Sequence, residues 1–258
     1  MAHTTIEYAL DAGIARLTLN RPDVLNGMNA EMRAEVRDAV TRAGNEARVL
    51  VITGAGRGFC SGQDLGGETD VTRFDLKEIL KREYEPMLRA IHDCPIPTIA
   101  AVNGPAAGAG ANVALACDVV IAAESAFFMQ AFSLIGLIPD AGGTYILPRN
   151  IGFARAMGAA LFADRISARQ AADWGLIWEM APDDEFEARV NQRAETLAKG
   201  PTKAYRLIKQ AIRASFDNDL DAQLALEAEL QGEAGKSRDF AEGVQAFNEK
   251  RKPRFEGH

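Results

Sequence analysis

Histidine, cysteine and tryptophan are scarce in this chain of 258 residues. It has three histidines, three cysteines and two tryptophans. Residues this few and this scattered exclude a disulfide framework and the usual zinc-binding clusters, so no metal site is predicted. Cys60, Cys94 and Cys117 are odd in number and lie in apolar or glycine-rich sequence. We therefore expect buried thiols in a reducing compartment.

The sequence also lacks a long apolar run and an excess of positive charge. No run approaches the roughly 20 apolar residues that cross a bilayer, and the start of the chain does not have a signal-peptide pattern. A net charge of −7 argues against general affinity for nucleic acid or anionic membranes. We expect a cytoplasmic protein with neither nucleic acid nor membrane as a partner. A local basic patch for a phosphate-bearing ligand is compatible with this charge.

Patterns typical of strands and helices alternate up to about residue 200. Strands are predicted at about 4–9, 14–20, 49–53, 98–102, 119–122 and 126–129, and helices at about 29–45, 75–93, 106–116, 151–162, 168–174 and 186–199. Three charged amphipathic helices follow, at about 202–215, 220–232 and 237–250. This order predicts an α/β core in residues 1–200 and a helical region in residues 201–258. The polar segment 66–72 is expected to be mobile.

One acidic residue, Asp140, directly follows a proline and precedes a pair of glycines. Pro139 disfavours helical backbone at Ile138, and Gly142 and Gly143 allow a sharp turn. The Asp140 carboxylate could therefore be held at the mouth of an apolar cleft. On spacing alone, an N-cap of the following helix is the commoner role for such an aspartate.

Two glycine-rich loops, at about 54–67 and 103–111, each follow a predicted strand. Unpaired backbone N–H groups at the start of a helix favour an oxygen atom that gains negative charge, and small residues let a ligand approach the main chain. Neither loop matches a P-loop or a dinucleotide-binding fingerprint. Alone, each loop is weak support for a site, because glycine-rich turns between strands and helices are common packing devices.

Taken together, three motifs resemble the crotonase (enoyl-CoA hydratase/isomerase) superfamily in their order and spacing. They are Gly-Phe-Cys-Ser-Gly-Gln-Asp-Leu at 58–65, Asn-Gly-Pro-Ala-Ala-Gly-Ala-Gly-Ala at 103–111 and Ile-Pro-Asp-Ala-Gly-Gly-Thr at 138–144. The resemblance covers essentially the whole chain and implies a crotonase-type spiral of ββα units. It also implies a C-terminal helical region that builds a trimer or a dimer of trimers. The implied ligand is an acyl-CoA thioester, with coenzyme A part of the substrate and no separate cofactor.

The resemblance also implies roles for individual residues. Members of the superfamily bind the thioester oxygen with two backbone N–H groups, which match those of Gln63 and Ala109 here, and Asp140 matches the acid. Ala109 in place of the usual glycine is a mild departure, because the peptide group is the donor. The other expected substrate-binding residues are Ser61, Gly62, Asp64, Leu65, Gly108, Asn112, Phe132 and Leu137. Lys209, Phe247 and Lys250 are candidates for holding the nucleotide of coenzyme A.

The acidic residues indicate which reaction to expect. Hydratases of the superfamily use two glutamates, and those positions hold Asn112 and Phe132, neither of which transfers a proton. Asp140 alone suits a 1,3-proton shift through a dienolate, and apolar neighbours such as Phe132 would raise its pKa. Further runs, including 54–65 and 132–140, resemble the isomerases of bacterial phenylacetate degradation. A general enoyl-CoA isomerase and a hydratase-like member remain alternatives.

Two other functions remain open on the sequence alone. Dehalogenases of the superfamily use an aspartate at the matching position as a nucleophile, and they also need a histidine base and an aromatic cradle that includes tryptophan. Here the histidines are His3, His92 and His258, and Phe132 occupies the tryptophan position. The chain could also be a non-catalytic acyl-CoA binder.

Overall fold

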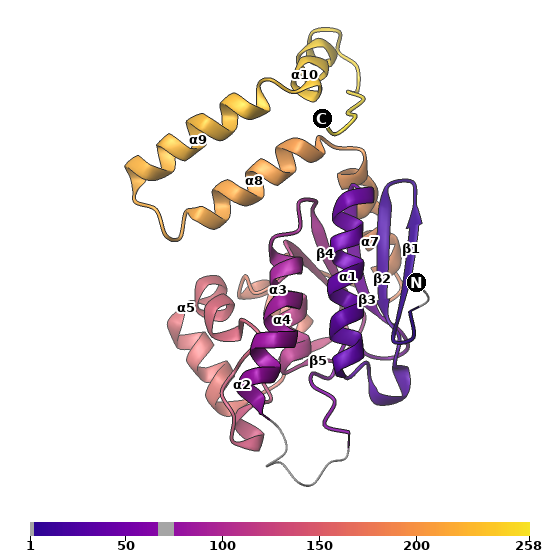
Figure 1. The fold of residues 1–258 in the computed structure, drawn as a ribbon, viewed down its shortest axis with the longest axis vertical. Helices are drawn as coiled ribbons and strands as arrows, with labels where there is room; N and C mark the ends of the chain where they lie inside the picture. Colours follow the sequence, from indigo (N-terminus) through magenta and orange to yellow (C-terminus); the bar gives the residue numbers. More distant parts are fainter. Residues whose placement is uncertain (1–2, 67–74) are drawn as a thin grey trace.

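The core of the chain is a six-stranded sheet in the order β1-β2-β3-β4-β6-β9. The computed structural model describes residues 3–66 and 75–258 (Figure 1). In the large sheet β1 and β2 form an antiparallel hairpin and the remaining neighbours are parallel. A smaller sheet has the order β5-β7-β8. The strands are β1 (Ile6–Asp11), β2 (Ile14–Leu19), β3 (Val49–Gly54), β4 (Thr98–Val102), β5 (Ala106–Ala107), β6 (Val119–Ala123), β7 (Phe127–Met129), β8 (Ile166–Ser167) and β9 (Glu179–Ala181).

The central strands are buried along their whole length, as continuous apolar runs predict for parallel strands. Every residue of β3 and β4 is buried. Thr53 keeps its hydroxyl satisfied by donating a hydrogen bond of 2.9 Å to the carbonyl of Ala101 on the neighbouring strand. Both glycine-rich loops leave the sheet next to these two strands, so the sheet fixes where the loops begin.

Helices pack around these sheets, and their starts follow sequence signals. Asn29 caps α1 as predicted, because its side chain accepts the backbone N–H of Met32 at 2.8 Å. Ser167 caps α6 in the same manner. Figure 1 shows α1, α3 and α4 beside the large sheet and α5 on the outer side of α4. The bounds are α1 (Ala30–Glu46), α4 (Ala109–Leu115), α5 (Gly143–Phe162), α6 (Ala168–Asp173) and α7 (Phe186–Ala198).

The helix predicted at 75–93 is interrupted by a π-helical turn. It comprises α2 (Leu76–Ile79), the π-helical turn Leu80–Tyr84 and α3 (Glu85–His92). Pro86 follows the wide turn. Proline has no N–H for the helical ladder and its ring collides with the carbonyl four residues earlier, so the preceding turn widens. The predicted helix is confirmed over residues 76–92, with a π-helical turn that the sequence did not predict.

Three helices follow residue 200: α8 (Thr202–Ala214), α9 (Leu220–Ala234) and α10 (Arg238–Asn248). All three confirm the predicted helices within a few residues. In Figure 1 α8 and α9 run side by side, beyond the end of the sheet, and α10 lies near the C-terminus. The division of the chain into residues 1–200 and 201–258 stays a prediction.

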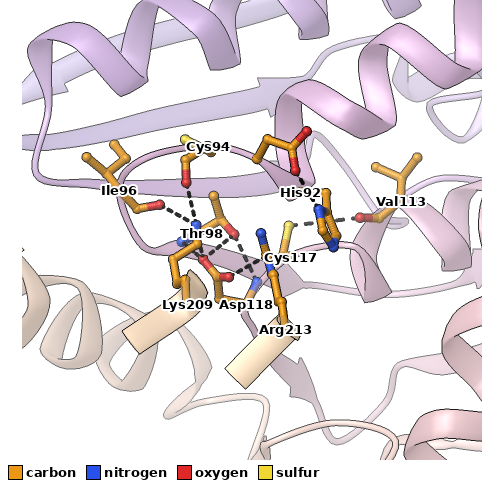
Figure 2. Close-up of polar contacts among 10 residues, drawn as sticks. His92, Cys94, Ile96, Thr98, Val113, Cys117, Asp118, Lys209 and Arg213 are labelled. Carbon is orange, nitrogen blue, oxygen red and sulfur yellow. Dashed lines mark hydrogen bonds and ion pairs between the residues drawn. The ribbon is translucent and has the colours of Figure 1, made fainter. Parts of the chain in front are cut away.

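A cluster of charged side chains fastens α8 to the core (Figure 2). Asp118 accepts the ammonium of Lys209 and the guanidinium of Arg213, each at 2.7 Å, and both the N–H and the hydroxyl of Thr98. Lys209 also donates to the carbonyl oxygens of Cys94 and Ile96 at 2.6 and 2.8 Å. Its three N–H donors are thus all used, which argues against the nucleotide-binding role we expected for Lys209.

The three cysteines are free and buried, which confirms the prediction of buried thiols. Burial raises the pKa of Cys60 to about 12, so this thiol is not a nucleophile near neutral pH. Within residues 3–66 and 75–258, no helix is both long and apolar enough to cross a bilayer. Of the segment 66–72 expected to be mobile, all but Gly66 lies outside the described residues.

Candidate active site

The two glycine-rich loops lie against each other at the ends of β3 and β4. The N–H groups of Phe59 and Cys60 donate to the carbonyl of Pro105, and the N–H of Ala107 donates to the carbonyl of Cys60 at 2.9 Å. Gly110 packs directly on that Cys60 carbonyl, so a side chain there would collide with the first loop. The sequence predicted both loops, and the structure brings them into contact.

Gly62 brings the first loop close to the start of α4. Its φ of +100° lies in a region that favours glycine, and a Cβ atom there would lie 3.0 Å from the Ala107 oxygen and 3.5 Å from the Ala109 nitrogen. The backbone N–H groups of the neighbouring Gln63 and Ala109 have no hydrogen-bond acceptor in the described parts of the chain. Ala109 is the first residue of α4, where N–H groups have no intrahelical partner. Two backbone donors are therefore available on adjoining loops.

Asp140 lies beside α4 and does not cap the next helix. The N-cap of α5 is Gly142, which has no side-chain cap. Oδ1 of Asp140 is buried without a hydrogen-bond partner in the described residues. Burial raises the pKa of this carboxyl to about 6. The carboxyl is thus largely ionised near pH 7 and can accept and return a proton.

Asn112 contacts the backbone of Asp140, and Phe132 lies against the second loop. The Asn112 side chain is fully buried and donates from Nδ2 to the backbone carbonyl of Asp140 at 2.8 Å. The Phe132 ring lies against Gly108, at 3.8 Å from where a Cβ atom would be. Neither side chain provides an acid or a base at this point. Asp140 is therefore the carboxyl of this part of the site, next to α4.

A pocket of about 490 Å³ opens from Asp140 toward α3. Tyr84, at the end of the π-helical turn, is a buried aromatic residue of its wall. Glu85 is a second carboxylate of the wall, but it is half-exposed and paired with Arg89 at 2.9 Å. His92 also lines this pocket, with Nδ1 2.7 Å from the Asp93 carboxylate. The site is an apolar cavity with one unpaired carboxyl at its inner end.

Other predicted substrate-binding residues hold the first loop in place. Ser61 donates from Oγ to the carbonyl of Val24 at 3.1 Å. Asp64 accepts the Gly66 N–H at 2.8 Å and pairs with Arg21 at 2.7 Å, and these contacts lower its pKa. Substrate contact at these positions stays a prediction.

Leu65 and Leu137 are the remaining apolar residues predicted to bind substrate. Both are partly exposed, and neither lines the pocket beside Asp140. Their contact with a substrate also stays a prediction.

Three residues near Asp140 have no signal in the sequence. Tyr84 reaches the pocket because the π-helical turn resets the helix register. His92 lines the pocket from α3, although its side chain is 45% exposed. Gln130 pairs with Asn112 across 18 positions of sequence. The glutamine is visible in the sequence, but nothing local predicts its partner.

Comparison with known proteins matches this geometry to one family. Residues 9–258 match the family model for enoyl-CoA hydratase/isomerase. The chain belongs to the enoyl-CoA hydratase/isomerase family. A crystal structure of an enoyl-CoA hydratase from Bacillus anthracis superimposes with a TM-score of 0.93 at 32% identity, covering 99% of this chain and 100% of that one. The α/β crotonase-type fold predicted from the motifs is thereby confirmed.

Two curated members of the enoyl-CoA hydratase/isomerase family differ in the activity that their names state. A Rhodobacter capsulatus protein named "Probable enoyl-CoA hydratase" is 58% identical over 257 residues, covering 100% of both chains. The 1,2-epoxyphenylacetyl-CoA isomerase of Escherichia coli is 49% identical over 253 residues, covering 96% of this chain and 97% of its own. Membership of this family makes the chain an enzyme that acts on acyl-CoA. The names of similar proteins include both hydratases and isomerases.

Proposed function

We propose that the chain is an acyl-CoA isomerase that moves a double bond by a 1,3-proton transfer. One observation carries the proposal: Asp140 is a buried carboxyl without a partner in the described residues and its backbone is bonded to Asn112 of α4, while Asn112 and Phe132 stand where hydratases of the family have glutamates. Water addition needs one group to activate water and another to supply a proton. Isomerisation needs one group that removes a proton and returns it nearby, which a single carboxyl does.

In this mechanism the backbone N–H groups of Gln63 and Ala109 bind the thioester oxygen. Asp140 takes the α-proton, the electron pair delocalises into a dienolate, and the same carboxyl returns the proton to the γ-carbon. Substrate and product are isomers, so no co-reactant is needed. Each N–H donor of such a hole contributes about 3–4 kcal/mol in the transition state, and the acid–base group contributes roughly 10²–10⁴ in rate.

For the substrate, we propose 1,2-epoxyphenylacetyl-CoA, with an oxepin-CoA as the product. The isomerase that is 49% identical to this chain supports this choice. The epoxide opens to the seven-membered ring by electrocyclic rearrangement. A 1,3-proton shift then brings the double bonds into conjugation with the thioester. Because this second step is an ordinary β,γ-to-α,β shift, simple 3-enoyl-CoA esters should also react.

The test compares three substrates with one enzyme preparation: 1,2-epoxyphenylacetyl-CoA, a 3-enoyl-CoA and a 2-enoyl-CoA. Products are followed by ultraviolet absorbance and mass, since hydration adds the mass of one water molecule and isomerisation adds none. We expect double-bond migration at least about a hundredfold faster than hydration, the contribution of one missing acid–base group. Comparable rates would refute the proposal and favour the hydratase activity in the name of the 58% identical relative.

The position of His92 favours a second candidate function, in which Asp140 is a nucleophile. His92 lines the same pocket as Asp140 and pairs with Asp93, so the dehalogenase-type reaction has a histidine available. Phe132 in the tryptophan position weighs against it. Incubation with 4-chlorobenzoyl-CoA distinguishes the two candidates, because this reaction releases chloride and forms an aryl ester on Asp140. Neither product is expected from an isomerase.

A further inference from the structure

Two buried amide side chains form a reciprocal pair behind Asp140. Gln130 donates from Nε2 to Oδ1 of Asn112 at 2.8 Å, and Nδ2 of Asn112 lies 3.3 Å from Oε1 of Gln130. Both residues are almost completely buried. A buried amide without a partner is unfavourable, so each side chain fixes the orientation of the other.

The pair reaches the backbone of Asp140 through the same Nδ2 atom. The Asp140 carbonyl accepts this nitrogen at 2.8 Å and the N–H of Gly143 at 2.8 Å. A Cβ atom at Gly143 would lie 2.5 Å from the Asn112 nitrogen, so only glycine leaves room for the contact. Gly143, the second glycine of the motif, is thus needed because the Asn112 amide approaches its Cα closely, and not only because the chain turns there.

The backbone that follows Asp140 needs such support. Ala141 has a φ of +48°, an unfavourable region for a residue with a side chain, and Gly142 follows at +83°. Strained backbone persists only where its surroundings hold it. The Asn112 amide is bonded at the carbonyl that precedes this turn.

We propose that Asn112 and Gln130 are positioning residues that hold the Asp140 carboxyl at the inner end of the pocket. The inference rests on the proposed function, in which Asp140 carries the proton. Asn112 occupies a position where hydratases of the family have a catalytic glutamate. In this chain the residue has a different role, because it transfers no proton and orients the group that does. Gln130 acts one step further away, through Asn112.

Substitution of each member tests the proposal by steady-state kinetics with a 3-enoyl-CoA. Gln130→Met is matched in volume and should lower kcat about 3- to 10-fold, the effect of leaving the buried Asn112 amide without its partner. Asn112→Ala should lower kcat at least about 10-fold, with KM within about 3-fold in both variants. Because Gln130 acts through Asn112, the double variant should be no slower than Asn112→Ala alone. Additive losses, or kcat values within about 3-fold of wild type in folded variants, would overturn the proposal.

The pH profile separates positioning from general stability. If the Asp140 loop loosens, water reaches the carboxyl and the apparent pKa in kcat/KM should fall from about 6 toward the ordinary aspartate value. The other titratable groups of the pocket are on other elements and are unchanged in these variants: Lys81, Tyr84, Glu85, Arg89, His92 and Tyr145. A profile that keeps its wild-type midpoint in both variants would contradict a positioning role.

A second asparagine–glutamine pair provides the control. Asn218 donates to Gln223 at 3.0 Å at the turn between α8 and α9, far along the chain from the pocket. Asn218→Ala should leave kcat and the pH midpoint unchanged. Asp140→Asn completes the set: if it retains activity, the proposed function fails. If it loses activity while the Asn112 and Gln130 variants behave as wild type, the positioning inference alone fails.

Discussion

Replacing Asp140 with asparagine should stabilise the protein while it abolishes isomerisation. The carboxyl has a buried Oδ1 without a partner in the described residues, and burial raises its pKa from 3.8 to about 6. The folded state therefore holds the proton more tightly than the unfolded state does. Wild-type stability contributed by this group is fully present below pH 3.8 and is lost as pH rises to about 6. Above about pH 6 the ionised carboxyl is a constant cost to the folded state.

The size of this free-energy cost follows from the pKa shift of Asp140. About two pKa units at about 1.36 kcal/mol each give a ceiling of about 3 kcal/mol. The carboxyl opens onto the pocket and is partly solvated, so we reduce this to about 1–2 kcal/mol. A neutral amide at the same place avoids the cost of burying a charge. The Asp140→Asn variant should therefore unfold at a higher denaturant concentration at pH 8 and show little difference from wild type near pH 4.

The assay is denaturant unfolding at equal protein concentration and unchanged m-value, run at pH 4 and pH 8. Turnover of a 3-enoyl-CoA by the same samples should fall at least about a hundredfold. Asp64→Asn is the matched control, and its effect on stability should have the opposite sign, because hydrogen bonds from Gly66 and Arg21 lower the pKa of Asp64. That variant should be less stable at pH 8. Equal or lower stability of Asp140→Asn at pH 8 would refute the reasoning about the buried charge.

Three further outcomes are expected. Ala109→Pro removes a donor N–H at a helix start that tolerates proline, and it should lower kcat roughly 10²–10³-fold. Ala109→Gly keeps this N–H and should have a mild effect. If both variants fold and have similar kcat values, the N–H of Ala109 is not a donor. In wild type, log kcat/KM should rise with unit slope up to a pH of about 6 and stay level above it, and a midpoint above pH 8 would indicate another base. Apolar side chains such as Leu220, Phe240 and Phe247 are exposed on the C-terminal helices, so we expect sedimentation to show a trimer or hexamer. A stable monomer at micromolar protein concentration would contradict this expectation.

Much of the fold could be predicted because its signals are local. Asn29 caps α1 through a contact three residues away, and the β-branched run in β3 is buried as such runs usually are. The three short strands β5, β8 and β9 were missed, since two or three residues carry no periodicity. The π-helical turn was missed for a related reason: apolar spacing over 75–93 fits an α-helix, and Pro86 indicates a disturbance without giving its form.

Only part of the candidate site could be predicted, again because only local signals are visible in the sequence. Asp140 and the two loops could be placed because motifs and turn residues mark them. The interpretation of Asp140 as an N-cap was excluded only by the structure, in which Gly142 takes that place. The contact between Gln130 and Asn112 joins residues 18 positions apart, and the place of His92 in the pocket depends on how α3 packs. Such long-range contacts have no signature in a single sequence.

The π-helical turn also bears on how this pocket can diverge. A π-helical turn contains one residue more than the α-helical turn it replaces. Loss of a single residue between Leu80 and Tyr84 would turn every earlier side chain of the helix by about 100° relative to α3. Leu80 and Lys81 would then leave the pocket wall, while the loops and Asp140 would stay where they are. A one-codon deletion in this helix would thus change the wall of the pocket without changing Asp140.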